Sequence, residues 1–262
     1  NDVSKTNQLL IYKKYFGKIK VTKTITGFRK IHWTTHEILD YGRLELPSST
    51  LMTKAYWFSV SPEIVASLKE DQSWFDEVND YGKDWERIRQ NVLQRDQFKC
   101  QACGNEESKR LEIHHKTPFK MFKNKVQAND LSNLVTLCPA CHREAEAMIK
   151  IQSALSGADY LLHHLAPLLL MCETNDLGVH KEACAIYADQ NPCVLLHDTV
   201  PGGIGLSEKL YEEHLLLLKQ AIDNLNACQC TEGCPSCTGA VSENGWGAKK
   251  LVRFILEALY AK

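Results

Sequence analysis

The sequence between residues 100 and 142 decides the fold of the middle of the chain. It reads Cys100-Gln-Ala-Cys103, then His114-His115, then Asn133-Leu-Val-Thr-Leu-Cys138-Pro-Ala-Cys141-His142. Two CxxC pairs supply four thiolates, which is enough to close a tetrahedral zinc site. The histidines between and beside the pairs are left over, and they could hold a second, reactive metal.

The residue types in this stretch match the needs of phosphodiester hydrolysis. The reaction requires a nucleophilic water, a cation on the phosphate and help for the departing oxygen. A neutral imidazole can accept the proton of the water because its pKa lies near the working pH. An amide side chain can fix the tautomer of that imidazole through its second nitrogen. His115, Asn133 and His142 supply these groups within one short unit.

Residues 84–146 resemble the HNH endonuclease family, whose fold is the ββα-metal unit. The resemblance rests on Arg95-Asp-Gln-Phe-Lys-Cys100, on Ile113-His-His-Lys116 and on the run from Asn133 to Cys138. It implies that His115 is the general base and that Asn133 orients it. It also implies a catalytic Mg²⁺ or Mn²⁺ on His114 and His142, with Glu146 as a further candidate ligand. The structural zinc ligands would be Cys100, Cys103, Cys138 and Cys141.

Plainer interpretations of the same residues stay open. The four cysteines could build a zinc ribbon whose histidines are only polar surface groups. Asn129 competes with Asn133 for the amide role, and we prefer Asn133 because an Asn-Leu run leads from it into the second CxxC pair.

The loop that follows His115 combines lysines with aromatic residues. Its lysines could bind phosphates and its rings could stack on bases; these residues are Lys116, Lys120, Lys123 and Lys125, with Phe119 and Phe122. An ordinary solvated loop with two core-facing rings explains the same pattern.

A second cysteine cluster reads Cys228-Gln-Cys230-Thr-Glu-Gly-Cys234-Pro-Ser-Cys237. CxC plus CxxC can wrap one tetrahedral ion, and Gly233 eases the turn between the pairs. With no base nearby, we interpret the cluster as a second structural zinc site. The spacing of Cys172, Cys184 and Cys193 is irregular, so we expect small buried hydrophobic residues there.

Both sides of the nuclease-like stretch are similar to the zinc-binding C-terminal domain of DEAD/DEAH-box DNA helicases of the mitomycin-repair type. The similar segments are Gly27-Phe-Arg-Lys30, Leu44-Glu-Leu-Pro47, Thr53–Trp57, His164–Gly178, His197–Leu206 and the second cysteine cluster. His197 departs from the pattern, because the family often has Tyr before Asp198. The resemblance implies DNA and the upstream motor domains of the same polypeptide as partners.

We therefore predict an α+β protein in which a zinc-stabilised ββα-metal HNH unit is inserted in a mixed α/β helicase-associated domain. The predicted domains are residues 1–72, 73–150 and 151–262, the outer two belonging to the helicase-associated domain. We predict strands at 9–15, 17–25, 31–34, 55–60, 110–115 and 192–197, and helices at 62–70, from 85, from 142, at 154–172, 207–227 and 248–261.

The run Gly202-Gly203-Ile-Gly205 lies between a predicted strand and a predicted helix. It could hold a phosphate at the helix N-terminus, but a lone glycine cluster is weak evidence, and we favour a tight turn that packs helix against sheet. No GxxxxGK[ST] motif occurs, so this chain is not expected to hydrolyse ATP.

Charge and composition bound the remaining possibilities. The net charge is −1, but residues 84–150 carry 12 basic and 9 acidic side chains, whereas residues 151–262 carry 7 and 13. The basic middle permits contact with nucleic acid. The absence of an apolar run long enough to span a bilayer, and cysteines grouped for metal, predict a cytoplasmic protein without membrane contact. Because the chain begins at Asn1, we expect it to be part of a longer protein.

The sequence thus favours a metal-dependent DNA endonuclease of HNH type, set in the C-terminal portion of a helicase for DNA repair or defence against foreign DNA. The alternative is a non-catalytic, zinc-structured DNA-binding domain that guides the helicase.

Overall fold

A five-stranded antiparallel sheet forms the base of the protein. The structure, a computed structural model, describes residues 2–8, 12–34, 38–70, 80–106, 110–122, 124–240 and 248–260. The strand order is β1 (Asp2–Gln8), β2 (Tyr12–Lys23), β5 (Ser49–Val60), β9 (Asn191–Asp198) and β8 (Leu177–Ala185). Strand β5 pairs directly with β9, so segments far apart in the sequence build one sheet.

Strand β5 is buried on both faces, which explains why residues 55–60 read as a nearly continuous apolar run. On one face, Trp57 stacks on Tyr15 with ring centroids 5.4 Å apart. On the other face, Tyr56 and Phe58 join the main hydrophobic core.

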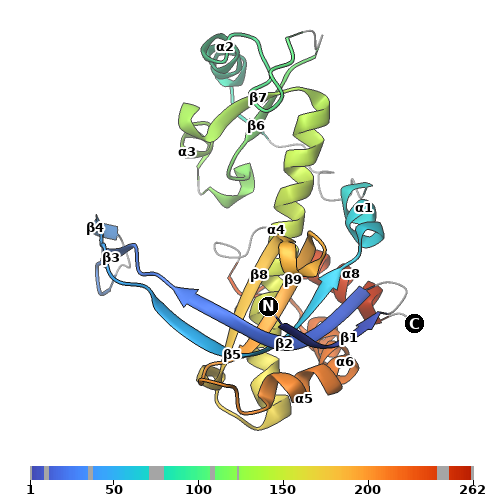
Figure 1. Cartoon of the computed structure of the whole chain (residues 1–262). Helices are drawn as coiled ribbons and strands as arrows, with labels where there is room; N and C mark the ends of the chain where they lie inside the picture. Colours follow the sequence, from blue (N-terminus) through green and yellow to red (C-terminus); the bar gives the residue numbers. More distant parts are fainter. Residues whose placement is uncertain are drawn as a thin grey trace.

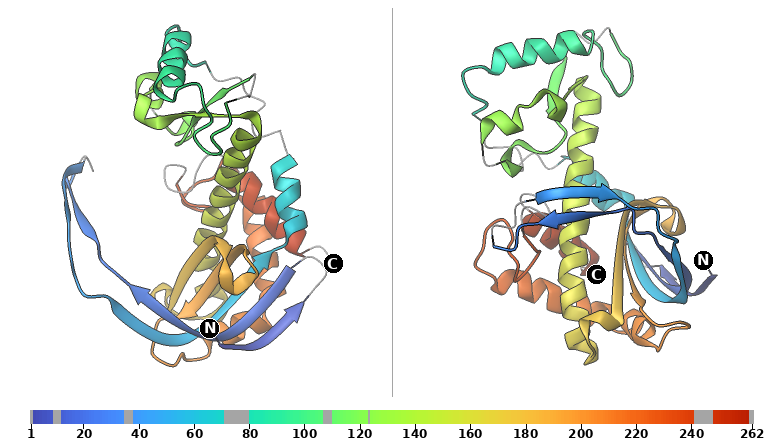
Figure 2. Two further views of the ribbon diagram at one scale, coloured as in Figure 1. Left: turned by 45° about the horizontal axis from the view of Figure 1, so that its top comes forward. Right: turned by 90° about the vertical axis from the view of Figure 1, so that its left-hand side faces the viewer.

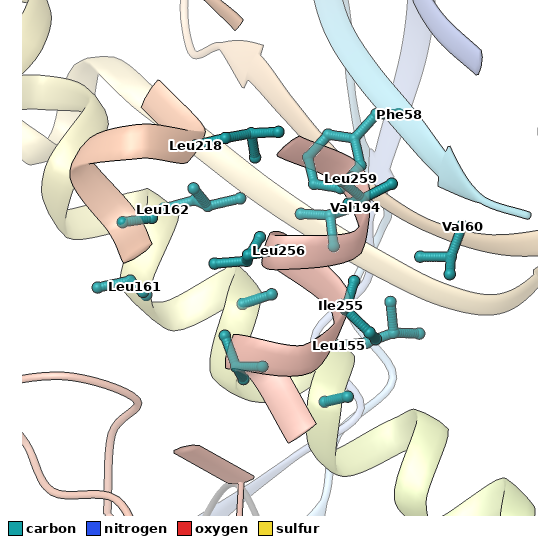
Figure 3. Packing of buried hydrophobic residues seen from close by; sticks show 14 of the residues in the cluster. Phe58, Val60, Leu155, Leu161, Leu162, Val194, Leu218, Ile255, Leu256 and Leu259 are labelled. Atoms are coloured by element: carbon teal, nitrogen blue, oxygen red, sulfur yellow. The ribbon is translucent and has the colours of Figure 1, made fainter. Parts of the chain in front are cut away.

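A layer of helices covers that second face of the sheet (Figures 1 and 2). These helices are α1 (Pro62–Glu70), α4 (Pro139–Leu170), α5 (Leu206–Glu212), α6 (His214–Ala227) and α8 (Ala248–Tyr260). Figure 3 shows the core between the two layers, where Leu162 of α4 and Leu256 of α8 lie near Phe58 of the sheet.

A smaller unit lies at the far end of α4 (Figure 1). Strands β6 (Glu112–His115) and β7 (Leu134–Leu137) form an antiparallel hairpin in which His115 lies opposite Leu134. The first turns of α4 complete this ββα unit, and α2 (Trp85–Arg95) packs on β7. Its remaining elements are short: η1 (Phe119–Met121), α3 (Lys125–Ala128) and η2 (Leu131–Asn133). The α+β fold class is therefore confirmed.

The remaining strands form a ribbon apart from the main sheet. Strands β3 (Gly27–Ile31) and β4 (Ile38–Arg43) pair only with each other and project from the ends of β2 and β5. Short turns η3 (Thr174–Asp176) and η4 (Ile186–Ala188) flank β8.

Helix α4 departs from the predicted organisation. Two helices were expected, from His142 and at 154–172, with a domain boundary between residues 150 and 151. The structure has a single helix of 32 residues across that boundary. The polar residue at the expected junction, Lys150, is buried and donates from Nζ to the carbonyl of Leu68 in α1 at 3.4 Å. Lys150 therefore joins two helices and does not lie in a linker between domains.

The other predicted elements are confirmed with shifts at their ends, except the strand expected at 31–34, which shares only Ile31 with β3. The expected strands at 9–15 and 17–25 are one strand, β2, and residues 9–11 lie outside the described residues. The expected helix at 207–227 is divided at Glu213. This break accompanies the burial of His214, whose Nδ1 is hydrogen bonded to the hydroxyl of Tyr56. Ser61 caps α1, its hydroxyl accepting from the N–H of Ile64 at 3.4 Å.

The core between α4 and the sheet should dominate stability. Leu162 is 0% exposed, whereas Leu168 of the same helix is 75% exposed. We expect Leu162→Ala to lower the free energy of unfolding by about 2–5 kcal/mol, because it leaves a cavity. Leu168→Ala should change it by no more than about 0.5 kcal/mol. Urea unfolding of both variants measures the difference, and equal effects would contradict this position of the core.

His214 should make stability depend on pH. Burial, and then the charge of Lys14, lower the pKa of His214 to about 3. Below an unfolded pKa of about 6.5, the unfolded chain binds a proton that the folded chain refuses, so the free energy of unfolding falls by up to about 1.4 kcal/mol per pH unit. We expect His214→Phe to flatten this slope between pH 6.5 and pH 5, and His180→Gln, at the surface, to keep it. Urea titrations at several pH values provide the test; a slope unchanged in His214→Phe contradicts it.

Candidate functional site

The first cysteine set closes around a common centre. One ligand atom from each of Cys100, Cys103, Cys138 and Cys141 lies within 4.8 Å of all the others. Cys103 and Cys138 bring their Sγ atoms to 3.9 Å. Zinc with four sulfurs at about 2.3 Å requires S···S separations of about 3.8 Å, so the thiols fit a tetrahedral zinc ion.

Backbone groups prepare this set for metal. Burial disfavours the thiolate of Cys100, but the N–H groups of Cys103, Cys138 and Ala102 outweigh it and lower the pKa of Cys100 to about 6. A thiolate is the form that binds zinc. Gly104, with φ of +72°, closes the first knuckle by donating its N–H to the carbonyl of Cys100 at 2.8 Å.

Arg95 and Asp96 fasten the knuckle to the hairpin. The carboxylate of Asp96 accepts from the backbone N–H of Thr136 at 2.9 Å and from Arg95 Nε at 2.7 Å. Arg95 also donates to the carbonyls of Leu131 and Leu134. The role of Arg95 and Asp96 does not follow from the sequence motif that contains them, because their partners lie about 40 residues further along the chain.

The second cysteine set also fits zinc. The Sγ pairs of Cys228, Cys230, Cys234 and Cys237 lie 3.5–3.7 Å apart. Gly233 adopts φ of +124°, and a Cβ there would meet Thr238 Oγ1 at 2.4 Å. Lys249 donates from Nζ to the carbonyls of Cys228 and Cys230 at 2.5 Å each, which ties the loop to α8.

His114 and His142 face each other at the hairpin. Their ring centroids are 5.1 Å apart and nearly perpendicular. Burial, with the charges of His142 and His115, lowers the pKa of His114 to about 4, so the ring is neutral and can bind a metal at pH 7. His142 Nδ1 lies 3.2 Å from Glu112 Oε2 and 3.7 Å from Glu146 Oε1.

Glu112 was missed from sequence, although it precedes His114 by two residues in the same strand and so shares its face. Burial raises the pKa of Glu146, against the opposing charges of His142 and Lys150. Among the described residues, the two cysteine sets are the groups in which three or more ligand atoms all lie within 4.8 Å of one another. His114, His142 and Glu146 do not form such a closed set. The chemistry of two imidazoles with two carboxylates nevertheless suits a divalent cation.

The tautomer of His115 follows from its hydrogen bonds. Nε2 of His115 lies 3.1 Å from Asn129 Oδ1, and Asn129 Nδ2 donates to the carbonyl of Tyr81 at 2.8 Å. Because the amide nitrogen of Asn129 donates to a carbonyl, the atom that faces His115 is the amide oxygen, which must accept a hydrogen bond. The proton of the neutral ring is therefore on Nε2, and Nδ1 carries the lone pair.

Aromatic rings hold the imidazole of His115 in place. Tyr81 and Trp85 lie nearly parallel to it, with centroids at 5.3 and 5.6 Å, and Phe119 meets it edge-on at 5.5 Å. Burial lowers the pKa of His115, while the bond to Asn129 acts in the opposite direction. For Phe119 the core-facing alternative is thus correct. The role of Tyr81 was not predictable, because it lies in a polar stretch that reads as a junction.

The prediction that Asn133 orients His115 is wrong in this geometry. Asn133 Oδ1 accepts from the N–H of Thr117, and its Nδ2 donates to the carbonyls of Thr117 and Ala128. Asn133 thus fastens the loop after β6 to the end of α3. The competing residue, Asn129, is the one that meets the ring, because α3 turns its side chain back toward the hairpin.

The predicted phosphate-binding lysines make contacts within the protein. Lys116 Nζ donates to the carbonyl of Ser132 at 2.8 Å, and Lys125 pairs with Asp80. Lys120 is half-buried, and Lys123 lies outside the described residues. Their contact with nucleic acid stays a prediction.

The backbone N–H groups of the glycine turn after β9 already bind a carboxylate of the protein itself. The carboxylate of Asp198 accepts from the N–H groups of Ile204, Gly205 and Ser207 at 2.6, 3.0 and 2.8 Å. The tight-turn interpretation is therefore confirmed, and the amides that a phosphate would use are occupied.

The three scattered cysteines differ from one another. Cys193 is buried, as expected, but Cys184 is exposed and Cys172 is half-buried. The prediction of a buried residue is wrong for Cys184, because its side chain points outward from edge strand β8. No helix among the described residues is long and apolar enough to cross a membrane.

Two family models match the chain. The model of the HNH endonuclease matches residues 100–147, and that of the MrfA Zn-binding domain matches residues 158–238. Both resemblances predicted from the sequence, to an HNH endonuclease and to a helicase zinc-binding domain, are therefore confirmed.

Three individual proteins are similar to this chain. The chain is 32% identical over 109 residues to the protein named Uncharacterized ATP-dependent helicase YprA of Bacillus subtilis (strain 168), which is 42% of this chain and 14% of the helicase. It is 41% identical over 44 residues to Uncharacterized protein MJ1572.1 of Methanocaldococcus jannaschii, 17% of this chain and 39% of that protein. A crystal structure of the DUF1998 helicase MrfA bound to DNA superimposes with a TM-score of 0.55 at 21% identity, over 99% of this chain and 24% of that chain, which shows a shared fold.

The two cysteine sets predict two zinc ions per chain. We expect Cys138→Ser to lower the zinc content from about two to about one per chain and to reduce the melting temperature, because its thiolate closes the first set. Cys184→Ser, outside both sets, should retain about two. Metal analysis of the purified proteins decides; two zinc ions retained in Cys138→Ser would contradict the first site.

Proposed function

We propose that the chain is a metal-dependent endonuclease of HNH type that hydrolyses phosphodiester bonds in DNA. The observation that carries the proposal is His115. Its Nε2 is committed to Asn129, its ring is packed against aromatic side chains, and its Nδ1 is left with the lone pair of the neutral ring. A structural zinc unit alone has no need for such a prepared imidazole.

In this mechanism Nδ1 of His115 takes a proton from the attacking water. Burial keeps the pKa of His115 below its usual value, so the ring is neutral at pH 7 and ready to act as a base. Asn129 is a positioning residue: it fixes the tautomer and stabilises the proton that stays on Nε2. The aromatic contacts prevent the ring from turning away.

His114 and His142 would hold the catalytic Mg²⁺ or Mn²⁺, with Glu146 and Glu112 as carboxylates within reach of His142. The cation, when bound, neutralises charge on the phosphate and the departing oxygen. The low pKa of His114 supports this role, because a neutral imidazole needs no deprotonation before it binds.

The similarity to helicases supports a wider setting. We propose that the chain is the C-terminal portion of a cytoplasmic DEAD/DEAH-box helicase that acts in DNA repair or in defence against foreign DNA. The MrfA-type domain and the YprA similarity favour this setting, and DNA and the motor domains of the same polypeptide would be its partners. None of the eleven cysteines forms a disulfide, which suits a reducing compartment.

One observation favours the alternative of a non-catalytic DNA-binding domain. Among the described residues, His142 and Glu146 approach each other, but His114, His142 and Glu146 do not place one ligand atom each within 4.8 Å of both others. In that alternative both zinc sites are structural, and no divalent ion would produce cleavage.

Nicking of supercoiled plasmid in Mg²⁺ or Mn²⁺ separates the two functions. We expect His115→Ala to lower the rate by about 100-fold or more, because it removes the base. His180→Ala, at the surface, should keep the parental rate. Binding without cleavage in either metal would refute the endonuclease.

Asn129→Ala tests the positioning role. We expect a loss of about 10- to 100-fold in kcat with KM for DNA unchanged. Because the bond to Asn129 raises the pKa of His115, its removal should also move the acidic limb of the pH–rate profile to lower pH. The surface variant Asn226→Ala should alter neither quantity. A fall in zinc content in place of a shifted profile would mean that Asn129 only maintains the fold.

A further inference from the structure

The ribbon of β3 and β4, with the loops around it, is a surface that the nuclease chemistry does not use. We define it as residues 24–34 and 38–48. It projects away from both the sheet and the helices (Figures 1 and 2), and every residue of β3 is exposed. An isolated two-stranded ribbon is at best marginally stable in water, so a partner that covers it would stabilise it.

Large apolar side chains on the ribbon face solvent. Trp33 is 90% exposed and Tyr41 is 78% exposed. Others share this exposure: Ile25, Phe28, Ile31, Leu39, Leu44 and Leu46. Exposed rings gathered in one projecting element are typical of a binding surface.

The two faces of the ribbon differ. On one face Phe28 lies over Gly42, since a Cβ at Gly42 would meet the Phe28 ring at 2.6 Å. On the other face the register places Arg29 opposite Tyr41 and Gly27 opposite Arg43. Because residues two apart in a strand share a face, Tyr41 has Arg29 across the ribbon and Arg43 beside it on the same face.

The charge of this region selects an anionic partner. The described residues from 18 to 54 carry seven basic side chains (Lys18, Lys20, Lys23, Arg29, Lys30, Arg43 and Lys54) against two acidic ones (Asp40 and Glu45). Lys54 approaches Glu208 at 4.0 Å. Within the described part of the chain, Arg29 and Arg43 make no ion pair with a carboxylate. A second copy of the ribbon would repel the first, which argues against self-association through this face.

We propose that the ribbon binds single-stranded DNA. Arg29 and Arg43 contact phosphates, and the rings of Tyr41 and Trp33 stack on unpaired bases. Exposed rings favour a single strand over a duplex, because the bases of a duplex are already stacked on one another. The choice of DNA as the nucleic acid rests on the proposed function; the arguments from charge and aromatic exposure do not. The strand that the ribbon holds would belong to the DNA molecule that the HNH unit cleaves.

Binding can be measured apart from cleavage. The full chain carrying His115→Ala, with zinc retained and without Mg²⁺ or Mn²⁺, is titrated into fluorescein-labelled dT30 while anisotropy is recorded at several salt concentrations. In this background we expect Tyr41→Ala to weaken binding by about 5- to 100-fold, because stacking on one base is lost. Tyr41→Phe keeps the ring and should bind as the parent does.

Arg29→Ala combined with Arg43→Ala tests the phosphate contacts. For a single strand each contact contributes about 0.7 to the slope of log K against log salt, so the slope should fall in magnitude by about 1.4. Lys219→Ala combined with Arg253→Ala removes two positive charges from α6 and α8 and should leave the slope unchanged. Melting curves and zinc content verify that each variant is folded.

Two results would overturn the proposal. Parental affinity for dT30 in both ribbon variants would exclude DNA as the occupant and leave a protein partner for this surface. Equal affinity for dT30 and for a duplex of the same length, insensitive to Tyr41→Ala, would exclude stacking on unpaired bases. Neither result depends on nicking, so failure of the ribbon and failure of the nuclease are distinguishable.

Discussion

Helix α4 is the element on which the rest of the structure depends. Its first turn contributes the thiol of Cys141 to the first zinc set and the imidazole of His142 to the candidate active site. Further along, a Cβ on Gly157 would meet Val252 Cγ2 at 2.6 Å, and Tyr160 donates from its hydroxyl to the carbonyl of Pro235 at 2.6 Å. Pro235 lies between ligands of the second set. One helix of about 48 Å therefore links both metal sites, and a rotation of α4 in the host domain must also move His142.

Bound zinc would take the place of the usual cap at the start of this helix. Cys138 occupies the N-cap position without a side-chain hydrogen bond to the backbone, and Pro139 follows it. Thiolates at a helix N-terminus are favoured by the helix dipole. Zinc on Cys138 and Cys141 would hold the helix end against the knuckle of Cys100 and Cys103, so that His142 of α4 stays beside His114 of β6. The structural zinc site and the proposed catalytic cation site would thus be coupled through one turn of helix.

The sequence predicted what depends on spacing along the chain. Closely spaced cysteine pairs must converge if they bind metal, so both zinc sets were accessible, and the resemblance to HNH endonucleases implied separate roles for His114 and His115. Contacts between loops could not be predicted in this way. Asn129 and Asn133 lie four residues apart in similar surroundings, and only the turn of α3 decides which one reaches His115. Tyr81 contacts the same ring across more than 30 residues, and no local pattern encodes that contact.

Because α4 is continuous, the inserted ββα unit is not independent of the host domain. Strand β5 and strand β9 are neighbours in one sheet although the whole ββα unit lies between them in sequence. The chain leaves the host domain through α1 and returns through α4, and Lys150 joins these two helices at the carbonyl of Leu68. Ends that meet in this way let a host fold tolerate an insertion. A flexible linker at the return would have left the two units independent. Because the helix is unbroken, the core of the host domain fixes the orientation of the ββα unit. The side chains that bury the second half of α4 in this core also set the direction of its first turn.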